Sequence, residues 1–530
     1  MDMSHSRTMP ALLAEITACQ PDVLFLVDGE TRLTYAAFRA ASRVVARGLH
    51  GLGVRPGDKV AILMGNRQEW LLAAFAITSL GATMVALNTW WRSAELQHAL
   101  ALSDTSVLLM ESRSGSRDFT AELAGIDGLV RDVPLLRQVV AIGEGAPFGA
   151  LSWAEMLAGG HAHDNELDRL EQAVQPDAPA YLLFTSGSTA RSKAVPLLHF
   201  GLVGNMHGIG ERMHLTPHDR MLMTVSMFWS FACANALFAV LTHGGAIVLQ
   251  YRFDAGDALR LIEQERISVL YTMPNMVLQM HTHPERVSRD LTSLRTGLGW
   301  PHSLPMLQEM GAYEMTTCYG LTEGYGNSAV ADCRIPMADR VGSSGTALPG
   351  TELQVVDAVT HAVLPAGETG EIRIRGYVTP GYYNDPARTK EAIDAENWFY
   401  TGDVAYLDDK GNVYFRGRNK EMVKTGGINV APAEVEELLH AHPAVRFAAV
   451  VGIPDPERDE VLAAMVVLEP GQSATPADLA RYCKANAAAY KVPHRIDLVA
   501  NEDMPLTDTG KISKRLIQDY FAQHPHPEHP

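Results

Sequence analysis

The chain has 530 residues, of which 47% are apolar and 20% charged, the balance of ordinary globular domains. This composition excludes a disordered, collagen-like or coiled-coil protein, and at about 150 residues per domain the length indicates three to four structural units. The 44 basic residues against 61 acidic ones give a net charge of −17. An acidic surface of this size argues against binding to nucleic acid or to an anionic membrane. If the substrates are anions, the chain must concentrate its positive groups locally.

The cysteines and the first residues indicate a cytoplasmic protein. The five cysteines show no metal-ligand spacing and are odd in number: Cys19, Cys233, Cys318, Cys333 and Cys483. Reduced thiols therefore fit them better than a disulfide framework. The first residues contain an early acid, Asp2, and no apolar core, so we expect no secretion signal. The longest apolar stretch, residues 71–87, is short for a transmembrane segment and favours a buried helix running into a strand.

Helical and strand-like patterns alternate through the first three fifths of the chain. Residues 34–53 predict a helix, because apolar positions recur three and four apart and glycines stand at its end. A strand at 59–64, a helix at 69–82 and a strand at 83–88 follow. The alternation recurs between residues 200 and 325. Such a pattern predicts an α/β fold with parallel sheets, here in two α/β subdomains.

The pattern changes near residue 341 and again near residue 418. Short β-rich runs separated by turn residues predict a small β subdomain, with a hairpin turn at 408–412. Beyond Arg418, a helix with Pro432 in its first turn precedes two strands, a helix, a further strand and a last helix, an α+β module. We therefore expect an N-terminal domain over residues 1–419 and a C-terminal domain over residues 420–530.

A loop rich in glycine and hydroxyl groups follows the apolar strand at residues 181–184. The loop consists of Thr185, Ser186, Gly187, Ser188 and Thr189. It offers many backbone N–H groups and four hydroxyls, which are the groups that bind phosphate. Lys193 lies six residues after Gly187, at the lysine spacing of a Walker loop. Ser192 and Ala194 stand where that loop has its second glycine and its magnesium-binding hydroxyl. The segment predicts a phosphate loop of another type or, alternatively, an ordinary polar turn.

Four further motifs follow in chain order. They are Tyr319-Gly320-Leu321-Thr322-Glu323, Tyr400-Thr401-Gly402-Asp403, Gly417-Arg418-Asn419-Lys420 and Thr507-Asp508-Thr509-Gly510-Lys511. Together with the loop, they resemble the adenylate-forming superfamily of acyl- and aryl-CoA ligases, peptide-synthetase adenylation domains and firefly-type luciferases. The resemblance covers nearly the whole chain and implies the same two-domain organisation.

The resemblance implies a reaction in two steps. A carboxylate first attacks the α-phosphate of ATP, which gives an acyl-adenylate and pyrophosphate, and the thiol of coenzyme A then displaces AMP. The first step brings anions together, and two like charges at about 4 Å repel by roughly 4 kcal/mol at an effective dielectric constant of about 20. Cations and directed N–H groups must offset this repulsion.

The resemblance also implies roles for single residues. The loop 185–189 and Lys193 would hold the β- and γ-phosphates, and Glu323 would hold Mg²⁺, a cation that prefers oxygen ligands. Thr322 would lie beside the α-phosphate, and Lys511 would bridge the carboxylate and the α-phosphate. Tyr319 would stack near the adenine or, alternatively, pack in the core, and Gly320 would belong to the same nucleotide site. Asp403 and Arg418 would bind the ribose.

For the second step, Lys420 matches the hinge about which the C-terminal domain rotates in this family. The rotation would withdraw Lys511 and bring in the segment that contains Lys424, Gly426 and Gly427. Paired glycines let a backbone approach a narrow channel for coenzyme A, although they are also typical of a tight turn. Such domain motions take microseconds to milliseconds.

The sequence departs from the family in its phosphate loop and in its acyl pocket. Ala190, Ser192 and Ala194 replace Gly, Pro and Gly of the usual loop. Trp229 stands where many acyl-CoA ligases have a histidine, so an indole would line or close the acyl pocket, or simply pack in the core. The other predicted pocket residues are Phe231, Gly297, Gly299 and Trp300. This set suits an apolar fatty, alicyclic or aryl acid and does not name it.

The leading hypothesis is thus an AMP-forming carboxylic acid–CoA ligase, a monomer or homodimer that acts on a small-molecule acid, ATP and coenzyme A. An adenylating enzyme that loads a carrier protein is the alternative, and a luciferase-like oxygenase is a weaker one. A non-catalytic nucleotide sensor could dispense with Glu323 and Lys511, yet both are present. Ser192 and Ala194 disfavour a P-loop phosphotransferase.

Overall fold

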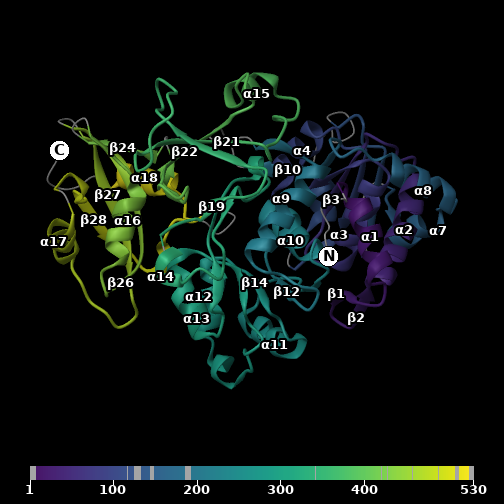
Figure 1. Cartoon of the computed structure of the whole chain (residues 1–530), viewed down its shortest axis with the longest axis horizontal. Helices are drawn as coiled ribbons and strands as arrows, with labels where there is room; N and C mark the ends of the chain where they lie inside the picture. Colours follow the sequence, from purple (N-terminus) through teal and green to yellow (C-terminus); the bar gives the residue numbers. More distant parts are fainter. Residues whose placement is uncertain are drawn as a thin grey trace. The chain divides into compact units, whose positions relative to one another are not determined.

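The computed structural model describes most of the chain (Figure 1). The described residues are 7–115, 117–124, 133–143, 149–160, 162–185, 192–340, 342–418, 421–425, 428–455, 458–487, 489–507 and 512–524. The chain forms two compact units. The first contains Met1–Leu353, Ile374–Phe399 and Lys410–Val413, and the second contains Gln354–Arg373, Tyr400–Asp409 and Tyr414–Pro530.

The first unit contains two seven-stranded sheets, which we name sheet A and sheet B. In spatial order, sheet A consists of β16 (Glu314–Thr316), β15 (Thr296–Leu298), β14 (Val269–Tyr271), β12 (Arg220–Met223), β13 (Ala246–Leu249), β1 (Leu24–Asp28) and β2 (Thr31–Thr34). Its strands are parallel except for β2, which runs antiparallel to β1. Along β12, Met221 and Met223 join one apolar core and Leu222 joins another, so the sheet is buried on both faces.

Sheet B has the same mostly parallel construction. In spatial order, it consists of β11 (Lys193–Leu198), β10 (Pro179–Thr185), β4 (Thr83–Ala86), β3 (Lys59–Leu63), β5 (Val107–Glu111), β8 (Gln138–Ile142) and β9 (Leu151–Ser152). All neighbours are parallel except β11, which is antiparallel to β10. The predicted α/β class with parallel sheets is therefore confirmed.

Helices share one large core with the facing sides of both sheets. These helices are α1 (Met9–Cys19), α2 (Tyr35–Gly51), α3 (Gln68–Ser79), α9 (His199–Arg212) and α10 (Leu237–Leu241). Every residue of α3 from Trp70 to Thr78 is buried, as expected for a helix that is apolar on all sides. The apolar stretch 71–87 is thus α3 running into β4, as predicted. Among the described residues, no helix is both long and apolar enough to cross a membrane.

Further helices cover the outer faces. The second face of sheet A packs on α11 (Ala255–Glu265), α12 (Pro274–Thr282) and α13 (Leu304–Glu309). The second face of sheet B packs on α4 (Ser93–Leu102) and α5 (Phe119–Ala124). Two more helices, α7 (Trp153–Ala158) and α8 (Asp164–Ala173), lie along α2. Helices therefore cover both faces of each sheet. We look for the polar groups of a ligand site at the ends of the strands.

Two small sheets confirm the predicted β-rich region. One consists of β17 (Cys318–Tyr319), β18 (Ala329–Val330) and β19 (Thr346–Ala347), and the other of β20 (Glu352–Val356), β21 (Gly370–Arg375), β22 (Phe399–Leu407) and β23 (Val413–Arg418). The turn predicted at 408–412 connects β22 and β23, which are neighbours in the sheet. The short helices α14 (Met337–Arg340) and α15 (Pro386–Ala392) lie in the same part of the sequence.

The C-terminal part of the second unit is the predicted α+β module. Its sheet has the order β25 (Ile428–Val430), β24 (Val423–Thr425), β27 (Asp459–Leu468) and β26 (Val445–Asp455), and β28 (Arg495–Leu498) also pairs with β27. One face packs on α16 (Pro432–His440) and α17 (Pro476–Asn486), and the other on α18 (Lys514–Gln523).

Candidate active site

Two segments far apart in sequence meet at the carboxyl edge of sheet A. Ser230 lies in the loop after β12, and Thr322 lies in the Tyr-Gly-Leu-Thr-Glu motif beyond β16. Their hydroxyl oxygens are 2.9 Å apart. The carboxyl edge is where parallel α/β sheets bind their ligands, because loops from neighbouring strands converge there. The sequence-predicted Thr322 therefore occupies a position suited to a substrate.

The turn that carries Thr322 is held by close backbone contacts. A Cβ on Gly320 would lie 2.3 Å from the carbonyl oxygen of Gly326, so only glycine fits. Tyr325 has a left-handed φ of 61°, and its hydroxyl accepts the backbone N–H of Leu198 at 3.0 Å. Tyr319 is 5% exposed and pairs with Ala329 in the small sheet. The turn is thus fixed to Leu198, the last residue of β11, directly before α9.

Glu323 is a buried carboxylate with one neutral donor. Its side chain is buried at 6% exposure, and its Oε1 accepts the hydroxyl proton of Tyr382 at 2.9 Å. Burial, followed by the charge of Glu323, raises the pKa of Tyr382 far above its usual value, so the phenol keeps its proton and donates it. The backbone N–H of Tyr382 is itself held by the Thr389 hydroxyl at 2.9 Å.

Lys193 reaches the same tyrosine from the first residue of β11. Its Nζ lies 4.6 Å from the centroid of the Tyr382 ring and 3.4 Å from the hydroxyl. Thr185, at the end of β10, is directly opposite Lys193 in the antiparallel pair, so the two ends of the predicted phosphate loop are held together. Tyr382 therefore connects the loop lysine to Glu323. Ser186, Gly187, Ser188 and Thr189 lie outside the described residues.

Sequence reasoning missed Tyr382. The signal available was its place in Gly-Tyr-Tyr-Asn, residues 381–384, shortly after the β-rich run at 370–376. Gly381 has a φ of +141°, and a Cβ there would lie 2.4 Å from Thr389, which fixes the backbone directly before the tyrosine. Nothing in the sequence shows that this tyrosine contacts residues about 60 and 190 positions away.

Asp403 and Arg418 form a second group, within the second unit. Asp403 is 4% exposed, and its Oδ1 is 3.2 Å from the Nε of Arg418, whose side chain is 61% exposed. Gly402, with a φ of +72°, donates its N–H to Glu371 at 2.9 Å. A fixed, buried carboxylate beside a solvent-facing guanidinium offers acceptors to vicinal hydroxyls, as the predicted ribose role requires.

The predicted acyl-pocket aromatics lie where the two large sheets approach each other. Trp229, after β12 of sheet A, meets Trp90, after β4 of sheet B, edge to face at 5.3 Å between ring centroids. Phe228 completes this group at 5.3 Å from Trp90 and 5.5 Å from Trp229. Phe231 packs on Tyr271 at 4.9 Å. Trp90 is a residue that sequence reasoning missed.

The predicted pocket glycines face a different way. A Cβ on Gly297 would lie 1.8 Å from the carbonyl oxygen of Leu270, its partner strand, so glycine is required for pairing within sheet A. A Cβ on Gly299 would lie 3.1 Å from Leu307, in the core under α13. Phe231 and Trp229 pack against the opposite core. Trp300, directly after β15, is 47% exposed. A side chain at Gly297 would thus meet the neighbouring strand and one at Gly299 the core under α13, and the pocket role of both glycines stays a prediction.

The remaining predicted site residues lie outside the described residues or directly beside a segment that is not described. Lys424 belongs to β24. Lys420, Gly426, Gly427 and Lys511 lie outside the described residues, and their roles stay predictions.

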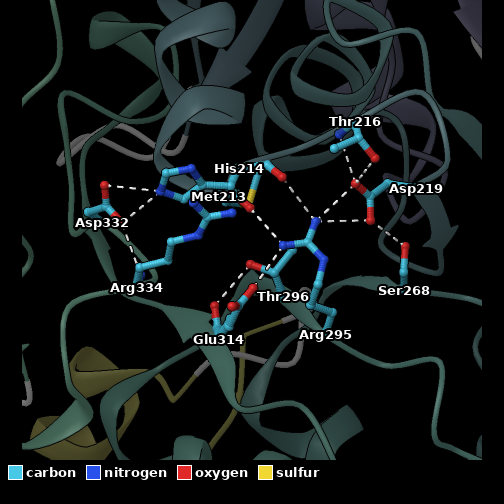
Figure 2. Close-up of polar contacts among 10 residues, drawn as sticks. All are labelled: Met213, His214, Thr216, Asp219, Ser268, Arg295, Thr296, Glu314, Asp332 and Arg334. Atoms are coloured by element: carbon cyan, nitrogen blue, oxygen red, sulfur yellow. Dashed lines mark hydrogen bonds and ion pairs between the residues drawn. The ribbon is translucent and has the colours of Figure 1, made fainter.

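The amino edge of sheet A carries a dense polar network, shown in Figure 2. Arg295, directly before β15, binds both carboxylate oxygens of Asp219 at 3.0 and 2.9 Å and Glu314 at 2.9 Å. Asp219 also accepts the Ser268 hydroxyl at 2.7 Å and the Thr216 N–H at 2.8 Å. These residues all lie at or just before strand starts, so the network ties the amino ends of β12, β14, β15 and β16 together.

Comparison with known proteins assigns the family. Residues 13–383 match the family of AMP-binding enzymes, and residues 434–511 match the C-terminal domain of AMP-binding enzymes. YngI of Bacillus subtilis, which is named as an acyl-CoA synthetase, is 33% identical over 543 aligned residues, which cover 98% of this chain and 97% of that protein. A 3-[(3aS,4S,7aS)-7a-methyl-1,5-dioxo-octahydro-1H-inden-4-yl]propanoyl:CoA ligase of Rhodococcus jostii is 32% identical, over 97% of this chain and 98% of that protein.

Solved structures share the fold over nearly the full length. ATP-bound MatB of Rhodopseudomonas palustris has a TM-score of 0.83 at 25% identity, covering 96% of this chain and 98% of that chain. The anthranilate CoA ligase AuaEII, in complex with anthranoyl-AMP, has a TM-score of 0.85 at 26% identity, covering 98% and 97%. The chain therefore belongs to the AMP-binding enzymes, the adenylate-forming superfamily that its motifs indicate.

Proposed function

We propose that this enzyme activates a carboxylic acid with ATP to an acyl-adenylate and pyrophosphate, and then transfers the acyl group to coenzyme A with release of AMP. The observation that carries the proposal is the chain of contacts from the half-buried Lys193 through Tyr382 to the buried Glu323, next to Thr322 at the carboxyl edge of sheet A. It provides a cation, a carboxylate and hydroxyls, and Lys193 pairs with Thr185, where the predicted phosphate loop begins. Relatives named as acyl-CoA synthetases and CoA ligases, at more than 30% identity over nearly the whole chain, support the same function.

The chemistry of the donor set fits a magnesium ion with phosphates. Mg²⁺ is bound in proteins by one or two carboxylates together with phosphate oxygens. Glu323 is such a carboxylate, and the phenol of Tyr382 fixes its orientation. Mg²⁺ would supply charge neutralisation for the triphosphate. Lys193 adds a positive charge, and the loop 185–189 adds N–H and hydroxyl donors.

The other residues take roles around the adenylate. Thr322 hydrogen-bonds near the α-phosphate, Tyr319 and Gly320 border the adenine, and Asp403 with Arg418 holds the ribose. Lys511 neutralises and positions the carboxylate and the α-phosphate. Its contribution is electrostatic stabilisation of charge that develops in the transition state.

The second half-reaction requires a different arrangement of the chain. We assign residues 1–419 to an N-terminal domain and 420–530 to a mobile C-terminal domain with its hinge at Lys420. The segment of Lys424, Gly426 and Gly427 forms the wall of the channel for coenzyme A. A monomer or homodimer in the cytoplasm, acting in the metabolism of fatty or related acids, agrees with the reduced cysteines and the acidic surface.

The decisive experiment measures acid-dependent exchange of pyrophosphate into ATP across fatty, alicyclic and aryl acids, and then thiol consumption with coenzyme A. We expect exchange with at least one class of acid, and thioester formation with the same acid. Lys511→Ala should reduce the exchange by about 10²–10³-fold, because one oriented charge is lost. Lys484→Ala, an exposed lysine on α17, is the matched control and should change nothing. Exchange without thioester formation would instead favour a carrier protein as acceptor, and normal exchange in Lys511→Ala would refute the assignment.

A further inference from the structure

We propose that His207, Glu211 and His243 form a binding site for one divalent transition-metal ion of the zinc class. His207 and Glu211 are four residues apart on α9 and so lie on one face of the helix. His243 follows α10, which packs beside α9 (Figure 1). The nearest ligand atoms of the three side chains all lie within 4.8 Å of one another. Two imidazoles and a carboxylate, completed by water, are a common set for tetrahedral zinc.

The hydrogen bonds of His243 leave its Nε2 facing Glu211, where a metal ion can be bound by both. Its Nδ1 is 3.0 Å from the carbonyl oxygen of Ala239, which can only accept, so the proton belongs on Nδ1. The nearby hydroxyl of Thr242 donates its own proton to the Phe238 carbonyl at 2.8 Å. Nε2 faces Glu211 Oε1 at 3.1 Å, which is another acceptor. A neutral imidazole satisfies one of these two acceptors, whereas an imidazolium, or a metal ion bound to Nε2 and the carboxylate, satisfies both.

The arrangement of Nδ1 is also that of a metal ligand. Metal-binding histidines usually donate the second ring N–H to a carbonyl or carboxylate, which fixes the tautomer and the ring orientation. The Ala239 carbonyl provides this acceptor one helical turn before His243. The His243 side chain is 9% exposed, whereas Glu211 is 65% exposed, so the cluster has one largely enclosed ligand and one side open to solvent.

Gly210 makes room for this histidine. A Cβ on Gly210 would lie 2.2 Å from Cε1 and 2.3 Å from Nδ1 of His243. Glycine inside a helix is unfavourable relative to alanine, so its presence in α9 needs a packing reason. The imidazole of His243 provides that reason, and His207 stacks on it with ring centroids 5.1 Å apart. Gly210 thus holds the site open without being a ligand.

A second group with metal-ligand atoms is less suitable. His214, Asp332 and Cys333 also cluster, but both Asp332 oxygens already contact the same imidazole nitrogen at 3.0 and 3.2 Å (Figure 2). Burial raises the pKa of Cys333 to about 11, so its thiol keeps the proton that a metal would have to displace. This group serves as an internal control.

The test titrates the full chain with Co²⁺, without ATP or magnesium, and follows the visible absorption of tetrahedral cobalt. We expect one Co²⁺ per chain, displaced by Zn²⁺, and a rise of the melting temperature by about 2–4 °C with saturating Zn²⁺. His243→Ala and Glu211→Gln should each weaken binding by at least about 10-fold. Gly210→Ala should weaken it as well, because the added methyl group displaces His243.

The controls separate this site from other histidines. His214→Ala, and His526→Ala combined with His529→Ala in the C-terminal tail, should leave the cobalt spectrum and stoichiometry unchanged. Glu211→Gln alters an exposed side chain and therefore tests the site even if His243→Ala fails to fold. Binding that survives both His243→Ala and Glu211→Gln, that disappears in either control, or that does not saturate below about 1 mM would overturn the proposal.

Discussion

The two edges of sheet A use charged groups in opposite ways. At the amino edge, Arg295 lies directly between two carboxylates, Asp219 and Glu314. At the carboxyl edge, a neutral phenol, Tyr382, stands between Lys193 and Glu323, and hydroxyls of Ser230 and Thr322 meet beside them. Opposite charges in direct contact hold strands together. At the carboxyl edge a neutral phenol contacts both the lysine and the carboxylate, and we therefore interpret the amino edge as a structural network and the carboxyl edge as a candidate active site.

The largest expected effect lies at the carboxyl edge. Glu323→Gln keeps the size of the side chain and removes its charge, so we expect magnesium-dependent pyrophosphate exchange to fall by about 10²–10³-fold with little loss of stability. The measurement is the exchange rate as a function of magnesium concentration. An unchanged magnesium dependence would remove Glu323 as the metal residue.

The amino edge should show the reverse behaviour. Arg295→Leu leaves the nearly buried Asp219 without its cation, so the free energy of unfolding should fall by about 2–4 kcal/mol. Arg260→Leu on α11, whose ion pair with Asp257 is solvent-exposed, is the matched control and should cost about 0–1 kcal/mol. Denaturant titration measures both. If Arg295→Leu left the free energy of unfolding unchanged but lowered kcat of the folded enzyme, the distinction between the two edges would fail.

Tyr382→Phe tests whether the phenol that contacts both Lys193 and Glu323 contributes to catalysis. The substitution removes one hydroxyl and leaves the Glu323 carboxylate with one donor fewer, so we expect kcat to fall by about 10–100-fold with a smaller change in KM for the acid. Thr389→Val alters the residue that holds the Tyr382 backbone and should have a weaker effect. Equal kcat values for wild type and Tyr382→Phe would show that the phenol only packs.

Trp229→Ala has the smallest expected effect on rate, and acts on selectivity. Removing the indole from its contacts with Trp90 and Phe228 enlarges the space between the two sheets. We expect the preference between short and bulky acids to change by about 10-fold, a free-energy difference of about 1.4 kcal/mol. The preference is measured by competition between two acids. If it is unchanged, Trp229 packs in the core and does not line the acyl pocket.

Sequence patterns predicted local elements well and long-range contacts poorly. The helix α3, the strand β4 and the hairpin before β23 follow from apolar runs and turn residues that are contiguous in the chain. The Tyr382 bridge depends on contacts across about 60 and 190 residues, which periodicity does not encode. Gly297 gives a second example. The sequence predicts it in the acyl pocket and does not reveal that the Leu270 carbonyl, on the neighbouring strand, also requires a glycine there.

The most direct test of the central claim follows an oxygen atom. The wild-type enzyme is given ATP, coenzyme A, magnesium and an acid labelled with ¹⁸O in its carboxylate, and AMP and phosphates are analysed by mass spectrometry. Attack of the carboxylate on the α-phosphate predicts one ¹⁸O in each AMP and none in pyrophosphate. Label in inorganic phosphate, with ADP as the nucleotide product, would contradict adenylate formation.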